Sequence, residues 1–453
     1  MAPSLLCVPG RGKSAAGLFV MLGYYFELAL RSLKRSPILT ALMVLAVALG
    51  IGASMTTLTV LRVLSGDPIP GKSSKLYSPQ IDPRDLFGYA PGAEPPGQVT
   101  WIDGLNLLRA GRADRQALMT GGYVAVQSTG PNLDPFIEPA RYTTAGFFPM
   151  FDVPFQYGHS WTGSDDDDRA RVVVISHALN DRLFGGKNST GETVRLGGHE
   201  FRIAGVLGDW RPNPQFYDLN RKIYNENEGV YVPLSTSQDV GFEHGGDTEC
   251  WGNGAGARMN NDAPCVWLQF WVQLETPGKA AAYKQFLVQY SQGQRAMGRF
   301  RRPPNVRLRD VTQWLDYNRV VPQDVRLQTW LAFGFLLVCL VNTVGLMLAK
   351  FTRRQGELSV RRAMGASRRA LFGQLLVESG ALGLTGGIGG LLLALLGLSL
   401  VRHQPTTYAS LAHLDPAMLL TTFLLAIGAT LLAGVLPARR VSYVAPALQL
   451  KSE

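Results

Sequence analysis

One short segment matches the phosphate-binding loop of nucleotide hydrolases letter for letter. Residues 66–73, GDPIPGKS, fit the pattern G-x-x-x-x-G-K-[ST], in which backbone amides of a glycine-rich turn hold phosphate oxygens. That chemistry needs a strand before the turn and a helix after it, because the helix N-terminus completes the anion site. Here a long apolar segment precedes the motif, two prolines interrupt it, and an extended stretch follows. We therefore expect no nucleotide to bind at Lys72.

Two further groups of side chains have the chemistry of metal ligands. Asp165–Asp168 supply the carboxylate oxygens that calcium prefers, but they lack the alternate spacing and the glycine of a calcium loop. Histidines stand at positions 159, 177, 199, 244, 403 and 413 without the spacing of a zinc site. We expect a solvated acidic loop and no metal site.

Cys250 and Cys265 are candidates for a disulfide. Both fall in the region that the topology below places outside the cytoplasm, where the compartment is oxidising. A bridge would close a loop of about 16 residues and stabilise the fold by roughly 3 kcal/mol in the chain-entropy model. Two unpaired buried thiols are the alternative, so the disulfide is a hypothesis.

The composition is typical of a membrane protein with a sizeable water-soluble part. The chain has 453 residues, of which 46% are hydrophobic and only 17% are charged. A formal charge of +10 is compatible with nucleic-acid binding, but the basic residues stand beside apolar segments, so we expect no nucleic-acid partner. Four segments without Asp, Glu, Lys or Arg are long enough to cross about 30 Å of hydrocarbon. They are residues 38–61, 327–349, 379–401 and 417–436.

The basic residues also set the orientation of these segments. Lys and Arg gather before the first segment, between the second and third, and after the fourth, whereas the loop between the third and fourth holds only Arg402. The positive-inside rule therefore places both termini and the middle loop in the cytoplasm. The region from about residue 64 to residue 325 then lies outside.

These patterns predict an α-helical membrane protein with four transmembrane helices and a large mixed α/β domain inserted between the first and second. Residues 21–37 have the periodicity of an amphipathic helix that contacts membrane lipid. The expected parts are 1–20, a disordered or non-native extension; 21–63, amphipathic helix and first transmembrane helix; 64–325, outer domain; 326–349, second transmembrane helix; 350–370, cytoplasmic segment; 371–401, third transmembrane helix; 416–437, fourth transmembrane helix; and 438–453, cytoplasmic tail.

Inside the outer domain, local patterns predict individual elements. Residues 170–176 and 266–275 read as strands, and residues 192–207 read as two strands joined at Gly197-Gly198. Residues 279–298 have helical periodicity, and the Asn-, Gly- and Asp-rich stretch 211–260 is expected to be a long surface excursion.

The third apolar segment combines many glycines with one acid. Seven glycines lie between Gly380 and Gly397, and several of them stand three or four residues apart, which permits close helix packing. Packing within the chain and packing between subunits both remain open, with a slight preference for the latter. Glu378 stands at the start of the segment, where a carboxylate is costly unless it has a partner or lies near the headgroups; a functional role and a headgroup position are equally open.

The basic segment 350–379 is the most informative part of the chain. A topology signal explains its arginines, but it does not explain Glu357 or the compact Met-Gly-Ala-Ser turn. The segment resembles the loop of FtsX-like and MacB-like permeases, R-x-x-E-[IL]-x-[IV]-R-[RK]-A-[LM]-G-A-[ST]. The matching positions are Arg354, Glu357, Arg361, Arg362, Ala363, Met364, Gly365, Ala366 and Ser367.

Two other parts of the sequence carry the same resemblance. The P-A-R-R motif with Pro437, Arg439 and Arg440, at the end of the last apolar segment, is similar to the ending of this family. In the outer domain, residues 143–166, 172–186, 190–210 and 230–235 resemble the MacB-type periplasmic core in the same order. The resemblance therefore covers the chain from about residue 24 to its end.

The resemblance implies a permease of a mechanotransmission ABC transporter in the bacterial inner membrane, with the outer domain in the periplasm. The loop at 354–367 would dock on a separate cytoplasmic ATPase subunit, which binds ATP and Mg, so no catalytic residue and no cofactor are expected on this chain. Other implied partners are a second permease chain, identical or related, a membrane-fusion adaptor and an outer-membrane channel. Export of antibiotics, peptides or other small products is the expected function. The alternatives are a lipoprotein-release permease and an FtsX-like regulator of a cell-wall hydrolase.

Overall fold

The computed structural model describes residues 25, 27–28, 31–127, 134–220, 228–252, 262–403 and 416–442. Residues 1–20, for which a disordered or non-native extension is expected, lie outside the described residues, and so does most of the amphipathic stretch. The chain forms two compact units. We call Met1–Val63 with Pro322–Glu453 the helical unit, and Leu64–Val321 the sheet unit.

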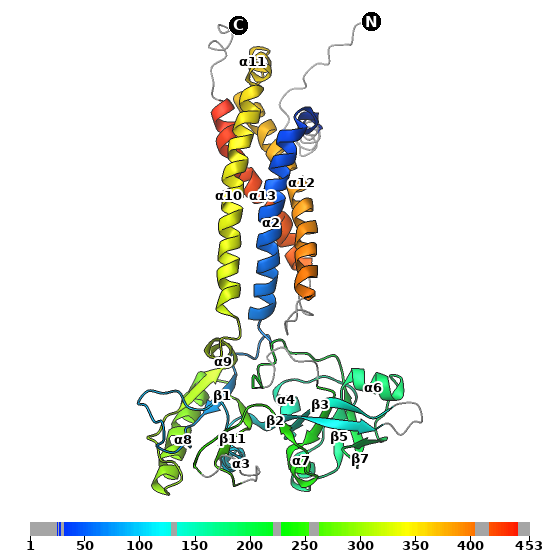
Figure 1. Cartoon of the computed structure of the whole chain (residues 1–453), viewed down its shortest axis with the longest axis vertical. Helices are drawn as coiled ribbons and strands as arrows, with labels where there is room; N and C mark the ends of the chain where they lie inside the picture. The colour runs from blue at the N-terminus through cyan, green and yellow to red at the C-terminus, as the bar shows by residue number, and fades with distance from the viewer. Residues whose placement is uncertain are drawn as a thin grey trace. The chain divides into compact units, whose positions relative to one another are not determined.

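Among its described residues, the helical unit contains four helices that are long and apolar enough to cross a membrane. They run side by side, with a short helix, α11, at one end (Figure 1). No charged side chain interrupts the central apolar run of any of them. The bounds are α2 Pro37–Ser65, α10 Gln323–Arg353, α11 Gln355–Ala363, α12 Arg368–Arg402 and α13 Pro416–Ser442.

The glycines of α12 pack against helices of the same chain. A Cβ atom built on Gly386 would lie 2.6 Å from Val47 of α2, and one on Gly387 would lie 2.9 Å from Ala426 of α13. Such distances leave no room for a side chain, so the glycines let α12 fit closely between α2 and α13. The preference for packing between subunits is therefore wrong at these positions.

The sheet unit is built on a mixed sheet, to which eleven strands contribute among the described residues. Its main path runs β13-β1-β12-β2-β3-β8-β5-β7-β4, while β6 pairs with β2 and β7, and β9 pairs with β2. The bounds are β1 Leu76–Gln80, β2 Arg115–Gln127, β3 Phe136–Thr143, β4 Phe155–Gly158, β5 Val172–Ile175, β6 Thr193–Leu196, β7 His199–Leu207, β8 Val230–Pro233, β9 His244–Gly245, β12 Gln269–Gln273 and β13 Arg307–Asp310.

Helices cover this sheet, and several begin at a polar cap. The Thr100 hydroxyl accepts a hydrogen bond from the Asp103 amide at the start of α3, and the Ser176 hydroxyl caps α6 in the same way. Apolar side chains of the sheet and helices form two buried clusters. The helices are α3 Trp101–Ala110, α4 Phe147–Met150, α5 Gly163–Asp167, α6 His177–Phe184, α7 Leu234–Asp239, α8 Pro277–Ala296 and α9 Val311–Tyr317.

The local patterns of the outer domain are largely confirmed. β6 and β7 form the expected antiparallel hairpin, and Gly197 and Gly198 both adopt positive φ at its turn. The strand expected at 170–176 is β5, the strand at 266–275 contains β12, and the helix at 279–298 is α8.

The prediction of a long surface excursion at 211–260 is wrong for residues 214–218 and 228–237, whereas the described residues 238–252 do lie at the surface. Phe216 and Tyr217 are buried in an aromatic cluster, and β8 is buried along its whole length. Asp218 and Glu228 are buried as well, because both form ion pairs with the buried Arg141. Polar composition is a poor guide to exposure here, since these polar side chains find partners inside the unit.

The acidic run is also not a solvated loop throughout. Asp165 forms a capping box with Thr162 at the start of α5. Asp166 is mostly buried and accepts hydrogen bonds from the Ala145 amide at 2.7 Å and from Trp161 Nε1 at 2.9 Å. Burial raises the pKa of the Asp166 carboxyl to about 6. This segment therefore anchors a helix start.

Lys72 of the GDPIPGKS motif has structural contacts within the sheet unit. Its Nζ donates to the Met150 carbonyl at 3.1 Å and lies 2.6 Å from Asp152 Oδ1. The motif forms a turn in which the Ser73 hydroxyl contacts Asp67. These contacts with the end of α4 and with Asp152 give Lys72 a structural role that needs no nucleotide.

Cys250 and Cys265 form a disulfide in the structure. The two residues face each other on the paired strands β10 Glu249–Cys250 and β11 Cys265–Val266, with Cα atoms 4.1 Å apart. The two strands alone would make a short ladder, so the covalent bond holds the ends of the segment between them together.

Candidate functional site

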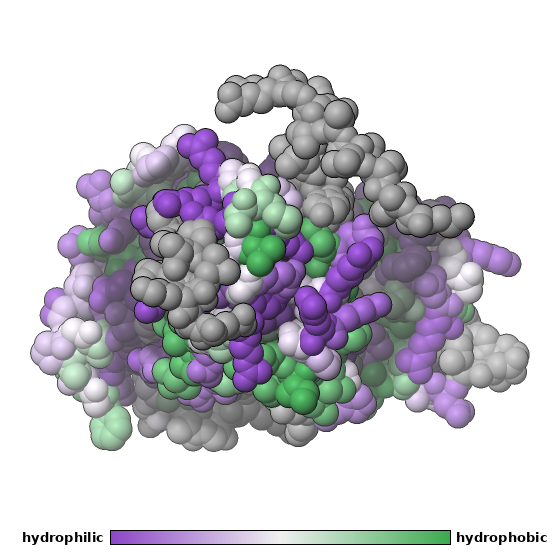
Figure 2. Space-filling model, turned by 90° about the horizontal axis from the view of Figure 1, so that it is seen from above, coloured by the Kyte–Doolittle hydropathy of each residue, from purple (hydrophilic) through white to green (hydrophobic). Residues whose placement is uncertain are grey.

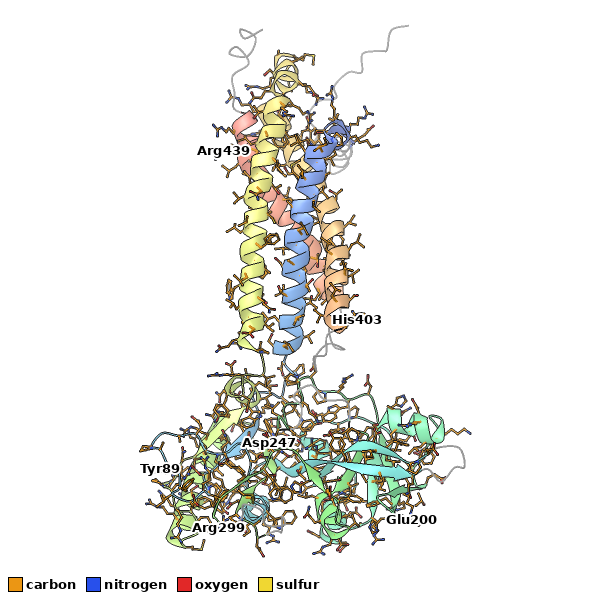
Figure 3. All side chains as sticks on the ribbon, viewed as in Figure 1. Tyr89, Glu200, Asp247, Arg299, His403 and Arg439 are labelled. Atoms are coloured by element: carbon orange, nitrogen blue, oxygen red, sulfur yellow. A yellow bond between two sulfur atoms is a disulfide. The ribbon has the colours of Figure 1, made fainter. Side chains whose placement is uncertain are left out.

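Three consecutive helices bring the charged side chains of segment 350–379 to one end of the helical unit. α10 continues as far as Arg353, α11 follows, and α12 begins at Arg368, so the segment contains two helix boundaries. Arg439, near the end of α13, lies at the same end, whereas His403 lies at the opposite end of the unit (Figure 3).

A buried ion pair stands at the base of this end. Lys350 Nζ lies 2.7 Å from Glu378 Oε1, and the two side chains are 2% and 1% exposed. The Lys350 amine and the Glu378 carboxylate form an ion pair, but their geometry is not that of a hydrogen bond. The Ser32 hydroxyl donates to Glu378 as well, from the helical residues that precede α2. Glu378 therefore has partners, which explains how a carboxylate occupies the start of an apolar helix.

Arg354 connects this buried pair to α11. Its Nη1 lies 3.3 Å from Glu378 Oε2, and its Nε lies 3.4 Å from Glu357 Oε2. Because Arg354 stands between α10 and α11, one guanidinium joins a carboxylate of α12 to a carboxylate of α11.

Glu357 is the centre of the outer part of the network. Besides Arg354, it pairs with Arg361 Nη2 at 2.8 Å and with Arg35 Nη1 at 3.1 Å. Partial burial raises the pKa of the Glu357 carboxyl, but the hydrogen bond and charges of Arg354, with the charges of Arg361 and Arg35, more than offset this and hold that pKa below its usual value. We define Arg35, Lys350, Arg354, Glu357, Arg361 and Glu378 as the charged network.

α11 and its C-terminal end also present apolar side chains to the surroundings. Leu358 is buried against the helix ends, but Val360 is 54% exposed and Met364 is 76% exposed. The two exposed residues are four positions apart, so they stand on one side of the helix. From above, this end of the unit shows hydrophilic side chains around a small hydrophobic area (Figure 2). Such an apolar pair inside a basic surface is suited to contact with another protein.

The Met-Gly-Ala-Ser turn has a local structural explanation. Gly365 has a φ of +102°, and its amide donates to the Arg362 carbonyl as α11 ends. The Ser367 hydroxyl then accepts from the Ala370 amide and caps α12. Gly365 and Ser367 therefore shape the turn, while Val360 and Met364 are the exposed apolar residues available for contacts.

The remaining predicted site residues lie around this network. Arg362, Ala363 and Ala366 follow Glu357 on α11 and in the turn, and Pro437 is buried inside α13, with Arg439 and Arg440 exposed after it. Sequence reasoning missed Lys350, Ser32 and Arg35 as partners. The signal was an acid, Glu378, that needed a cation, but the sequence does not show which of the many basic residues reaches it.

The two halves of the chain match two family domains. Residues 40–289 match the MacB-like periplasmic core domain, which is more than half of the chain, and residues 330–446 match the FtsX-like permease C-terminal domain. This chain belongs to the MacB-like, FtsX-like permease family. The resemblance of the loop, tail and outer-domain motifs is confirmed by these matches.

Several curated relatives are similar along much of the chain. The macrolide export ATP-binding/permease protein MacB of Wolinella succinogenes is 23% identical over 433 residues, which cover 94% of this chain and 60% of that protein. The pyoverdine export ATP-binding/permease protein PvdT of Pseudomonas aeruginosa is 23% identical over 370 residues, 81% of this chain and 50% of that protein. The chain thus spans about 60% or less of the length of these two relatives.

Among solved structures, the periplasmic region of MacB from Actinobacillus actinomycetemcomitans aligns with a TM-score of 0.35 and 15% sequence identity. The alignment covers 57% of this chain and 97% of that one.

Proposed function

We propose that this chain is the permease of a MacB-like ABC exporter and that α11 couples it to a separate cytoplasmic ATPase subunit. The observation that carries the proposal is the arrangement of α11: its acid is tied to the membrane helices, and its apolar pair Val360 and Met364 is exposed. An ATPase that binds this apolar pair would transmit its movement through Arg354 to α10 and α12. ATP and Mg would bind to that subunit, and this chain would need no cofactor of its own.

The proposal includes a topology. The chain would lie in the bacterial inner membrane as a multi-pass protein, with both termini and residues 350–370 in the cytoplasm. The domain that begins near residue 64 would be periplasmic, inserted between the first and second transmembrane helices. The basic residues around α11 and the end of α13 support a cytoplasmic position. The disulfide in the sheet unit supports an oxidising compartment for that unit.

Reporter fusions test this topology. A reporter that is active only in the cytoplasm is expected to give signal when it is fused after Leu450 and no signal when it is inserted near Asp209. Cell fractionation should recover both fusions in the membrane. Signal at both positions, or the reverse pattern, would contradict the proposed arrangement.

The cargo is proposed to be a small exported product, such as an antibiotic or a peptide. Two of the relatives carry the names of macrolide export and pyoverdine export proteins, which supports export over lipoprotein release or regulation of a cell-wall hydrolase. We infer that the periplasmic domain handles the cargo in a mechanotransmission cycle. A membrane-fusion adaptor, an outer-membrane channel and a second permease chain would complete the assembly.

Substitution at Met364 tests the coupling role of α11. Met364→Asp is expected to weaken association with the ATPase about tenfold or more, because burying a methionine contributes about 1.5–3 kcal/mol. Met364 is exposed, so the variant should reach normal membrane levels. Co-purification with the ATPase and export from cells measure the effect.

Four further variants make this test specific. Met364→Leu keeps an apolar side chain and should retain association. Glu357→Lys replaces the central acid of the network with a cation and should reduce both association and export, while Arg368→Lys should be mild. Gly365→Leu would strain the turn itself, because that residue has positive φ. Full association and export by both Met364→Asp and Glu357→Lys would reduce the segment to a topology signal.

A further inference from the structure

A cavity of about 500 Å³ lies in the sheet unit, between α8 and the loop that joins α3 to β2. α3 and α8 lie side by side (Figure 1), and the Tyr290 hydroxyl of α8 accepts from Asn106 and donates to Asp103 of α3. Small-molecule sites usually measure about 300–1,000 Å³, so this cavity is large enough for a ligand. Its lining residues come from 112–114 and 279–289. None of them belongs to the charged network or to α11, so the proposed function leaves the cavity unexplained.

Asp114 fixes the two walls of this cavity to each other. Its amide donates to the Gln273 carbonyl of β12 at 3.1 Å, and its carboxylate accepts from the Glu275 amide at 3.0 Å. The same carboxylate forms an ion pair with Lys279 in the first turn of α8. Gly111 ends α3 in the left-handed conformation, with a φ of +57°, and this turns the chain into the loop. The cavity therefore has a preformed shape, which lowers the cost of binding a ligand.

The cavity is lined by two cations and one carboxylate, which leaves one positive charge unpaired. Asp114 neutralises Lys279, and the hydrogen bonds from Lys279 and from the Glu275 amide hold the pKa of the Asp114 carboxyl below its usual value. Arg112 is the other cation, and it has no carboxylate partner among the described residues. Its guanidinium carbon lies 6.0 Å from the centre of the Phe286 ring, a cation–π contact. The N–H groups of Arg112 are therefore available to an anionic ligand.

The α8 wall of the cavity combines an aromatic surface with an unsatisfied hydroxyl. The Phe286 ring centre lies 5.6 Å from that of Tyr283, edge to face. Tyr283 is 2% exposed, and its hydroxyl has no hydrogen-bond partner among the described residues. Burial raises the pKa of this hydroxyl, so it stays neutral and can donate. A buried hydroxyl without an acceptor is costly, and an acceptor on a bound ligand would offset that cost.

We propose that this cavity binds a small aromatic carboxylate, with the carboxylate held by Arg112 and the Tyr283 hydroxyl and the ring packed against Phe286. A guanidinium donates two parallel hydrogen bonds to a carboxylate, and the Tyr283 hydroxyl supplies a third donor. A single carboxylate matches the one unpaired charge, whereas a dianion would leave a negative charge uncompensated. The inference uses neither the ATPase nor the exported cargo, so its failure would leave the coupling test at Met364 unaffected.

Equilibrium dialysis of the full chain in phosphatidylcholine nanodiscs, with empty nanodiscs as the blank, tests the ligand class. Naphthalene-2-carboxylate, followed by its own fluorescence, should bind one site per chain with a dissociation constant of about 1 mM or below, the affinity ordinary for a ligand of about a dozen non-hydrogen atoms. Naphthalene-2-carboxamide lacks the charge and cyclohexanecarboxylate lacks the aromatic ring, so each should compete at least about fivefold less well than the unlabelled probe. No saturable binding of the probe, or equal competition by the neutral amide, would overturn the proposal.

Two neighbouring alanines of α8 test the location of the site. Both are exposed, but Ala282 lines the cavity and Ala281 does not. Ala282→Trp should fill the cavity and raise the dissociation constant of naphthalene-2-carboxylate about tenfold or more, whereas Ala281→Trp should change it by less than about twofold. The thermal unfolding midpoint should be the same in both variants, because neither alanine is buried. Equal binding by the two variants would refute the assigned site.

Substitutions at the polar groups test how the carboxylate is held. Arg112→Gln should raise the dissociation constant about tenfold, the effect of losing a hydrogen bond between charged groups. Arg295→Gln is the matched control, since Arg295 is exposed on α8 and lies outside the cavity. Tyr283→Phe should raise the dissociation constant about threefold without destabilising the empty chain, because its hydroxyl has no partner there among the described residues. An unchanged dissociation constant in either Arg112→Gln or Tyr283→Phe, or an equal loss in Arg295→Gln, would contradict the proposed contacts.

Discussion

Arg141→Met is expected to destabilise the sheet unit by about 3–5 kcal/mol, because it leaves two buried carboxylates without their cation. Arg141 on β3 is fully buried, with Nη1 2.8 Å from Asp218 Oδ2 and Nε 3.0 Å from Glu228 Oε1. Burial alone would lower the pKa of the Arg141 guanidinium, but the charges of Glu228 and Asp218 raise it above its ordinary value. Its guanidinium carbon also lies 5.1 Å from the centre of the Tyr217 ring.

Chemical unfolding followed by tryptophan fluorescence would measure this loss in the full chain, since Trp271 and Trp314 lie in the aromatic cluster beside the network. Arg169→Met is the matched control. Arg169 pairs with Asp239 at the surface of the same unit, where an ion pair contributes less than about 1 kcal/mol. Similar small losses in both variants would show that the buried network is dispensable.

Glu378→Leu is expected to open the charged end of the helical unit, with a cost of about 3–5 kcal/mol. The change leaves Lys350 buried without its anion. It also removes the α12 carboxylate through which Arg354 connects α11 to α12. α11 should detach from the helix ends, so trypsin should cleave after Arg354 and Arg361 much faster than in the original chain. The rate of this cleavage in membranes and the thermal unfolding midpoint in detergent are the measurements.

The double variant Lys350→Met with Glu378→Leu gives this prediction its control. Replacing both members of a buried ion pair by apolar groups is often close to neutral, whereas removing one member is costly. The stability of the double variant should therefore lie nearer to that of the original chain than the stability of Glu378→Leu does. Some loss should remain, because Glu378 also pairs with Arg354. If the double variant is as unstable as the sum of the two single variants, the pair is not coupled as the structure indicates.

Some features of the fold follow directly from local sequence. The four apolar segments correspond to the long helices because an uncharged run of about 20 residues is already a complete signal for a membrane helix. The β6-β7 hairpin is equally local, since Gly197 and Gly198 supply the positive φ that its turn requires. The family motifs of the loop and tail are contiguous, so neighbouring residues alone are enough to recognise them.

Other features depend on contacts that no window of sequence contains. Asp218 and Glu228 stand 77 and 87 residues after Arg141, and their polar surroundings suggested a surface loop. The glycines of α12 showed that some helix would pack closely, but only their contacts with Val47 and Ala426 identified it.

For this protein, the sequence by itself determined the membrane segments, the family and the segment expected to couple to an ATPase, because each is encoded by neighbouring residues. Only the tertiary structure decided which charges pair. Lys350 and Glu378 lie 28 positions apart, and a basic segment offers Glu378 many equivalent partners until helix packing selects one. The same packing decided that the glycines of α12 face helices of their own chain, since burial is a property of neighbouring helices in space.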